Sequence, residues 1–198
     1  MTENFTLLAG WLAGTISFVA TARYIVAILR GGTRPNRATW WILTLVGGLV
    51  AVSYLASGAR HTMWIPVSYV VGPLLVALLS LRFGEGGWTR FDRYCVVSAL
   101  LGALVWMISE SSFAALQCFL VIDFVGLLPT FRKSYLDPES EDRWAWLLAA
   151  IAAAVNLLAV ERWEASIAVY PVYIVVGNGA IAALLFLPQK VRLGRIRL

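Results

Sequence analysis

The chain has 198 residues, of which 60% are hydrophobic and only 14% are charged, with a net charge of +5. Soluble domains carry about 25% charged residues, and a soluble chain of this size must cover its surface with polar groups. The composition therefore excludes a soluble enzyme, a disulfide-stabilised scaffold and a disordered chain, and it predicts an all-α protein that crosses a membrane several times.

Seven apolar stretches are each long enough for a membrane-spanning helix, which needs about 20 mostly apolar residues. The first follows an acidic start without a basic region, so we expect it to stay as a span and not to be cleaved as a signal peptide. Glycine, proline and polar residues separate the stretches, and the break near Ser111 is the weakest. In chain order, the expected spans are 5–29, 38–57, 63–82, 94–109, 113–131, 144–160 and 165–187.

Basic residues predict the orientation of these spans. Thirteen of the 16 lysines and arginines fall on one side of the expected helices, two fall on the other side, and Arg23 lies within the first span. Basic residues favour the cytoplasmic side of a membrane. We therefore expect an integral protein of a bacterial inner (plasma) membrane, with its N-terminus outside and its C-terminus in the cytoplasm. Its expected surroundings are the lipid bilayer, and no nucleic acid.

An internal repeat relates the two halves of the chain. A shift of 105 residues places Pro66 and Gly72 of the third span on Pro171 and Gly177 of the seventh. Three spans in each copy would point the copies in opposite directions, and one additional span between them restores the same direction. We therefore predict a 3+1+3 arrangement of parallel repeats. The expected boundaries are 1–90 for the first repeat, 91–112 for the linker helix, and 113–198 for the second repeat with a short basic tail.

The segment from Asp123 to Tyr135 contains a Pro129–Thr130 pair followed by two basic residues. This pattern and the helix plan resemble the SWEET and SemiSWEET sugar facilitators and the wider PQ-loop superfamily. The vitamin carriers of the PnuC family have a similar helix plan. The resemblance implies a transporter for a small polar solute that alternates access between two three-helix bundles, without a cofactor. The sequence leaves a homo-oligomer open.

Polar residues within spans are costly in lipid and tend to mark function. Asn156, Asn178 and Asp123 each lie roughly 14–15 Å along a helix from a span end, which is near the middle of the membrane. The resemblance implies a substrate-contacting asparagine on the seventh helix, where Asn178 is the match. The alternative is that the asparagines join helices as structural hydrogen bonds. The expected substrate-binding set is Asn178, Asn156, Asp123, Gln117, Tyr173 and Tyr69.

Arg23 meets Asp123 when the first span is shifted by 100 residues. We expect these two side chains to form an ion pair that closes the cytoplasmic side. The alternatives are that Asp123 couples transport to protons, that Arg23 extends to the lipid headgroups, and that Asp123 makes a structural hydrogen bond. Proline removes a backbone hydrogen bond within a helix, so hinges or static bends are expected at Pro66, Pro129 and Pro171.

No enzyme or metal signature is present, because one histidine and two separate cysteines do not make a metal cluster. Lys133 and Lys190 fall at helix ends, so we expect no retinal-binding lysine in mid-membrane, and on that ground we exclude a rhodopsin. Two other classes stay open beside the transporter. One is a membrane receptor or binding module on the same fold, and the other is an assembly subunit without a cargo. A hydrated central cavity would favour the transporter or the receptor, and a solid apolar core would favour the subunit.

Overall fold

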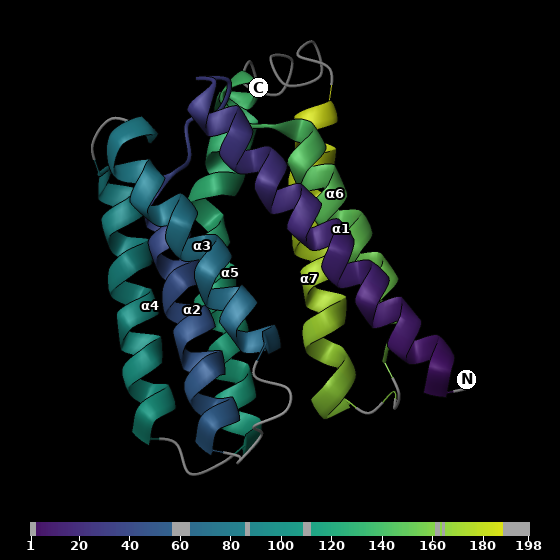
Figure 1. The fold of residues 1–198 in the computed structure, drawn as a ribbon. Coiled ribbons are helices and arrows are strands. Elements are labelled where there is room, and N and C mark those ends of the chain that lie inside the picture. Colours follow the sequence, from purple (N-terminus) through teal and green to yellow (C-terminus); the bar gives the residue numbers. More distant parts are fainter. Residues whose placement is uncertain are drawn as a thin grey trace. The chain divides into compact units, whose positions relative to one another are not determined.

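The computed structural model describes residues 3–56, 64–85, 88–108, 112–160, 163 and 165–187. Within these residues the chain forms seven α-helices, one short 3-10 helix and no strand (Figure 1). The elements are α1 (Glu3–Leu29), α2 (Arg37–Ala56), α3 (Trp64–Phe83), α4 (Arg90–Ile108), α5 (Ser112–Leu136), η1 (Pro138–Ser140), α6 (Arg143–Leu157) and α7 (Ala165–Phe186). The predicted all-α class with seven helices is confirmed.

Two helix ends differ from the expected spans because of their local side chains. α4 begins four residues early, at Arg90. Thr89 Oγ1 donates to Asp92 Oδ2 at 2.8 Å, and Asp92 N donates to Thr89 Oγ1 at 3.1 Å, so the pair caps the start of the helix. α5 continues to Leu136, five residues past the expected end, with Pro129 inside it. Interior proline is tolerated in spanning helices where neighbouring groups compensate for the lost hydrogen bond.

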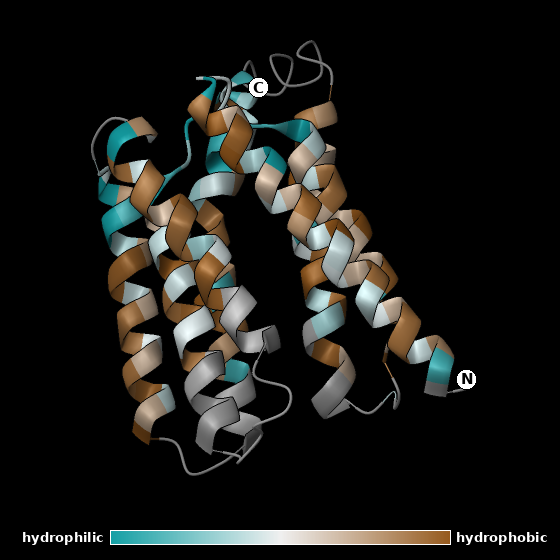
Figure 2. Ribbon diagram, viewed as in Figure 1, coloured by the Kyte–Doolittle hydropathy of each residue, from teal (hydrophilic) through white to brown (hydrophobic). Residues whose placement is uncertain are grey.

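The outer surface of α1 is typical of a helix in lipid. Small residues face inward, with Ala13 and Ala20 each 5% exposed, whereas Trp11 and Phe18 are 71% and 75% exposed. Figure 2 shows apolar residues along most of α1 and α4. Close packing through small residues is the usual way in which helices associate in membranes, where large apolar side chains contact lipid.

Two of the described helices, α1 from Asn4 to Leu29 and α4, are long and apolar enough to cross a membrane. Shorter apolar helical segments cover Val70–Phe83, Arg143–Leu157 and Pro171–Phe186. By length and composition, α1 and α4 are each suited to cross a membrane, and α3, α6 and α7 contribute shorter apolar segments.

The chain divides into two compact units. Unit 1 comprises Met1–Thr33 and Phe131–Leu198, which include α1, the end of α5, α6 and α7. Unit 2 comprises Arg34–Thr130, which include α2, α3, α4 and most of α5. These units cut across the expected repeat boundaries, because α1 groups with α6 and α7. The 3+1+3 repeat and its boundaries stay a prediction.

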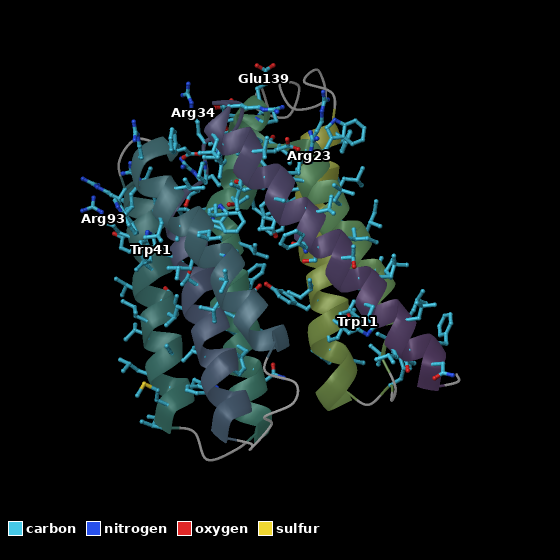
Figure 3. All side chains as sticks on the ribbon, viewed as in Figure 1. Trp11, Arg23, Arg34, Trp41, Arg93 and Glu139 are labelled. Carbon is cyan, nitrogen blue, oxygen red and sulfur yellow. The ribbon has the colours of Figure 1, made fainter. Side chains whose placement is uncertain are left out.

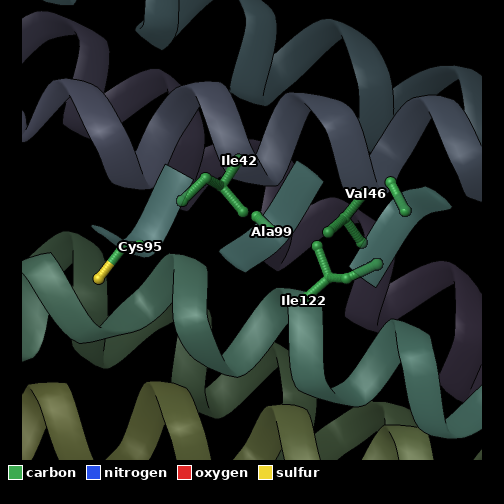
Figure 4. Close-up of a cluster of buried hydrophobic side chains, with 6 residues drawn as sticks. Ile42, Val46, Cys95, Ala99 and Ile122 are labelled. Atoms are coloured by element: carbon green, nitrogen blue, oxygen red, sulfur yellow. The ribbon is translucent and has the colours of Figure 1, made fainter. Parts of the chain in front are cut away.

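The core of unit 2 lies between α2, α4 and α5 (Figure 4). Glycines allow the close approach of these helices: a Cβ atom at Gly102 would lie 2.7 Å from Ile122 Cγ1, and one at Gly126 would lie 2.6 Å from Ile42 Cγ2. Small residues at such crossings increase van der Waals contact between helices. The buried core residues are Ile42, Val46, Cys95, Ala99, Ala103 and Ile122.

In unit 1, α6 packs against both α1 and α7. A Cβ atom at Gly10 of α1 would lie 3.8 Å from Ala159 Cβ, just past the end of α6, which is ordinary van der Waals contact. At the other end of α6, the rings of Trp144 and Phe186 meet edge to face with centroids 5.4 Å apart. These contacts place the end of α7 beside the start of α6.

Candidate functional site

A buried carboxylate lies in unit 1 between α1, the end of α5 and the start of α6. Glu141 Oε1 accepts a hydrogen bond from Lys133 Nζ at 2.9 Å, while Oε2 accepts from the Tyr24 hydroxyl at 2.8 Å and from Trp146 Nε1 at 3.0 Å. The side chains of Lys133 and Glu141 are 4% and 0% exposed. We call these four residues, together with Ser140, the Glu141 cluster.

The short connection between α5 and α6 positions this acid. Lys133 lies in the last turn of α5 and also donates to the Ser140 carbonyl at 3.1 Å. Pro138 begins the single turn η1, and Glu141 N donates to the Pro138 carbonyl at 3.3 Å. The connection therefore folds back, and Glu141 reaches the ammonium group of a residue in the preceding helix.

Arg23 and Asp142 form a second interaction directly beside the cluster. Arg23 Nε donates to Asp142 Oδ1 and its Nη2 donates to Oδ2, both at 3.0 Å. Asp142 also accepts from Ala145 N at 2.8 Å and so caps α6. Two adjacent residues of α1, Arg23 and Tyr24, thus bind two adjacent residues of the α5–α6 connection. Because the Arg23 side chain is 43% exposed, this pair contributes at most about 1 kcal/mol, and the buried Glu141 dominates the energetics.

Unit 2 has its own buried acid at the start of α4. Asp92 Oδ1 accepts from Asn36 Nδ2 at 3.3 Å, and Asp92 Oδ2 accepts from Thr89 N at 2.9 Å. Asn36 Oδ1 in turn accepts from Thr39 N at 3.1 Å, at the start of α2. Asp92 therefore holds the starts of α2 and α4 together, and its hydrogen bonds come from neutral donors.

Arg37 supports the same end of unit 2. Its Nε donates to the Ser80 carbonyl at 2.9 Å and its Nη2 donates to the Leu81 carbonyl at 3.3 Å. A cation at these carbonyls complements the negative end of the α3 dipole. Deeper in the unit, Thr130 Oγ1 donates to Thr39 Oγ1 at 2.9 Å and joins α5 to α2.

The structure corrects the expected partner of Arg23. Its guanidinium pairs with Asp142, within unit 1, in place of Asp123. The physical reason is that α1 packs along α6, where Asp142 is already held in place as the helix cap. Asp123 lies near the middle of α5 in unit 2 and is 3% exposed. Burial of Asp123 agrees with the cost of a carboxylate in lipid.

The two asparagines are placed differently from each other. Asn178 lies within α7, as expected, and is partly buried. Asn156 is the second-last residue of α6, and its carbonyl accepts from Leu158 N, so it marks a helix end and not the middle of a span. Neither asparagine side chain hydrogen-bonds to another described residue. The expected joint site of Asn156, Asn178 and Asp123 stays untested, since Asp123 belongs to the other unit.

The other expected binding residues are scattered. Gln117 is exposed on α5, and Tyr173 is partly buried on α7. Tyr69 is part of α3, but its side chain lies outside the described residues. Lys190 lies entirely outside them. Gln117 belongs to unit 2 and Tyr173 to unit 1.

The three expected hinge prolines have different surroundings. Pro66 is the third residue of α3, where proline removes no intrahelical hydrogen bond, so no hinge is needed there. Its side chain lies outside the described residues. Pro129 is fully buried inside α5, and Pro171 is partly buried inside α7. The latter two stay candidates for bends.

Sequence reasoning missed the Glu141 cluster altogether. Lys133 was expected at a helix end, and Glu141 was not singled out. No local sequence signal joins Tyr24 to Glu141, because 117 residues separate them. In the described part of the chain, no group of three or more metal-binding side chains is present.

Comparison with known proteins gives one informative similarity. The chain is 24% identical over 152 residues to a "Bacteriorhodopsin-II-like protein" of Haloquadratum walsbyi (strain DSM 16790 / HBSQ001), covering 76% of this chain. The chain spans 58% of the length of that relative. No protein-family profile matches the chain. No solved structure matches it either.

This similarity overturns the expected relationship to the SWEET and PQ-loop families, and with it the expected alternating-access transporter. It supports an integral membrane protein with seven helices, as in the described fold. The earlier exclusion of a rhodopsin was also too broad. A missing mid-membrane lysine argues against bound retinal, but it does not exclude a rhodopsin-like architecture.

The residues present do not fit a retinal linkage. Retinal is an aldehyde and would need a lysine amine to form a Schiff base. The sequence has only two lysines, and α7 contains neither. Lys133 is bound to Glu141 at the end of α5. Lys190 follows α7 by four residues and lies outside the described part.

Proposed function

We propose that the chain is a seven-helix membrane sensor with rhodopsin-like similarity that works without covalently bound retinal. The observation that carries the proposal is the buried Lys133–Glu141 pair, which uses one of the two lysines in the sequence as a structural partner. Without an amine in α7, photon capture through a Schiff base has no attachment point. We therefore expect a stimulus other than light absorbed by a retinal Schiff base.

The Glu141 cluster supports the role of a sensor because we expect it to have two discrete states. A buried ion pair adds little stability beyond that of apolar packing, yet losing one partner leaves the other charge uncompensated at about 3–5 kcal/mol. We therefore expect the Glu141 cluster to be either fully paired and buried or opened and hydrated, and intermediate arrangements to be rare. Switching proteins bias such two-state elements by a local change of charge or packing. In this chain the paired state holds α1 against the connection that begins α6.

The orientation proposed from the sequence, with the basic helix ends on the cytoplasmic side, fits the packing within each unit considered by itself. In unit 2, the start of α2, the end of α3 and the start of α4 meet through Arg37, Ser80, Asn36 and Asp92. In unit 1, the ring contact of Trp144 with Phe186 brings the end of α7 to the start of α6. These ends carry the basic residues, and basic residues favour the cytoplasm. A reporter fused after Leu198 is expected to be active in the cytoplasm only.

A retinal titration tests whether the protein works without covalently bound retinal. Purified protein incubated with all-trans retinal is expected to show no red-shifted visible band and no adduct after borohydride reduction. The matched variant Asn178→Lys supplies an amine in the middle of α7 and controls for access of retinal to the fold. A hydroxylamine-sensitive band in the unchanged protein would show that a light-absorbing pump or sensor is the right function. The variant Lys133→Arg would then identify the amine.

A distance measurement tests whether the Glu141 cluster has two states. Spin labels at Leu29 and Trp144, both exposed and both in unit 1, report on the separation of α1 from the start of α6. The variant Glu141→Gln is expected to add a population with a longer distance, whereas Glu139→Gln on the exposed surface of η1 is not. Identical distance distributions for all three proteins would contradict the two-state role of the cluster.

A further inference from the structure

Two exposed arginines stand at the start of α4. Arg90 and Arg93 are separated by three residues, so they lie on the same face of the helix. Both are exposed, and Figure 3 shows Arg93 extending away from the helices of its unit. The only acid in this turn, Asp92, is 5% exposed and accepts hydrogen bonds from Thr89 and Asn36. The outward face of the turn therefore carries two positive charges without compensation by Asp92.

Other basic residues of unit 2 already have partners within the fold. Arg37 donates to backbone carbonyls at the end of α3, and the Arg82 guanidinium packs over the ring of Phe83 at 5.5 Å. Arg90 and Arg93, in contrast, have no hydrogen-bond or ion-pair partner among the described residues. Their charges are thus available to a ligand from outside the chain.

An apolar stripe continues from the arginines along the same face of α4. Its members are all exposed and recur every three or four residues, which places them in one line along the helix. From Arg90 to Leu101 the helix rises by roughly 16 Å, about half the thickness of a bilayer core. Aromatic residues border the charged end, as is usual at a membrane interface. The stripe consists of Tyr94, Val97, Leu101, Leu104 and Ile108.

From this arrangement we infer that the start of α4 is a docking site for an anionic phospholipid. The phosphate of the headgroup binds Arg90 and Arg93, and the acyl chains lie along the stripe from Tyr94 to Leu104. Arginine suits phosphate because its planar fork donates two parallel hydrogen bonds. The lipid site lies in unit 2 and the Glu141 cluster lies in unit 1. The lipid site is therefore tested independently of the proposed function.

A local fluorescence probe tests this site. In a background with Cys95→Ala and Cys118→Ala, the variant Val97→Cys carries a fluorophore on the stripe. The protein is reconstituted into phosphatidylcholine vesicles with increasing brominated phosphatidylglycerol, which quenches the probe on contact. Brominated phosphatidylcholine gives the baseline for uncharged lipid. The pair Arg90→Gln and Arg93→Gln removes the proposed contacts, and the pair Arg82→Gln and Arg143→Gln removes the same total charge elsewhere.

We expect the brominated phosphatidylglycerol needed for half-maximal quenching to rise about fivefold for each of Arg90 and Arg93 removed, with no such rise in the charge-matched control. The variants Arg90→Lys and Arg93→Lys should keep most of the preference, which separates loss of charge from misfolding. Equal quenching in the unchanged protein and the Arg90/Arg93 double variant would overturn the inference, as would an equal rise in the control. Displacement by millimolar glycerol phosphate would show that the ligand is a soluble anion and not a lipid.

Discussion

Replacing Glu141 with glutamine leaves the buried Lys133 ammonium group without the carboxylate that it pairs with, while its hydrogen bond to the Ser140 carbonyl stays. The carboxylate has two acceptor oxygens for three donors, whereas glutamine offers one oxygen and turns an NH₂ group toward a donor. Breaking a buried ion pair by removing one partner costs about 3–5 kcal/mol. Since the pair is 4% and 0% exposed, solvent screening does not reduce this figure much. We expect Glu141→Gln to lower the free energy of unfolding by about 3–5 kcal/mol.

The double variant with Lys133→Met and Glu141→Gln separates the energetic coupling of Lys133 and Glu141 from general damage to the site. Lys133→Met alone leaves a buried carboxylate with two neutral donors, from Tyr24 and Trp146, and should also cost about 3 kcal/mol. Removing both charges together leaves no uncompensated ion, and such replacements are often close to neutral. The loss in the double variant is therefore expected to be at least about 2 kcal/mol smaller than the sum of the two single losses.

Unfolding in mixed micelles with increasing dodecyl sulfate, followed by far-ultraviolet circular dichroism, measures these free energies. The exposed neighbour Glu139→Gln serves as the control and should change stability by less than about 0.5 kcal/mol. If the two single losses add within about 0.5 kcal/mol in the double variant, the residues are not energetically coupled. A loss of under about 1 kcal/mol for Glu141→Gln would equally contradict a buried, charged pair.

The same unfolding assay checks three further expectations. Asp142→Ala removes the cap of α6 and should lower the free energy of unfolding by about 1 kcal/mol or more, whereas Asp142→Asn keeps the cap and should cost less. Equal losses would show that Asp142 stabilises the fold through its pair with Arg23 and not through the cap. Gly84→Ala should cost about 1–3 kcal/mol because its Cβ atom would lie 2.8 Å from the Pro35 carbonyl, while Gly48→Ala, with nothing within 4 Å, should be neutral or stabilising. Asn36→Ala should cost about 1–2 kcal/mol through loss of the α2 cap and of the donor to Asp92, and no change at all would argue against that link.

The number and class of the helices could be predicted from the sequence because runs of apolar residues separated by glycine, proline and polar residues are a local signal. Helix ends were less predictable. The fifth span was expected to end at residue 131, but α5 continues to Leu136. The early start of α4 depends on the Thr89–Asp92 cap, which is readable as a threonine three residues before an acid.

The candidate site could not be predicted, because its members are far apart in the sequence. Tyr24 and Glu141 are separated by 117 residues, and their contact depends on how α1 packs along α6. Asp123 was expected to be the partner of Arg23 because a shift of 100 residues aligns the two positions in the first and fifth spans. Asp142 is the observed partner, since a capping residue at a helix start is already held in one orientation.

The long separation between α1 and its partners has a consequence for synthesis at the ribosome. Arg23 and Tyr24 leave the ribosome well before Glu141 and Asp142, which follow 117 to 119 residues later. At about 5–20 residues per second, α1 waits roughly 6–24 s for the acids that bind it. During that interval α1 has to persist as an independent helix, and its 26 apolar-rich residues from Asn4 to Leu29 suit it for that. Chains that end before α6 would keep Arg23 without the acid that pairs with it.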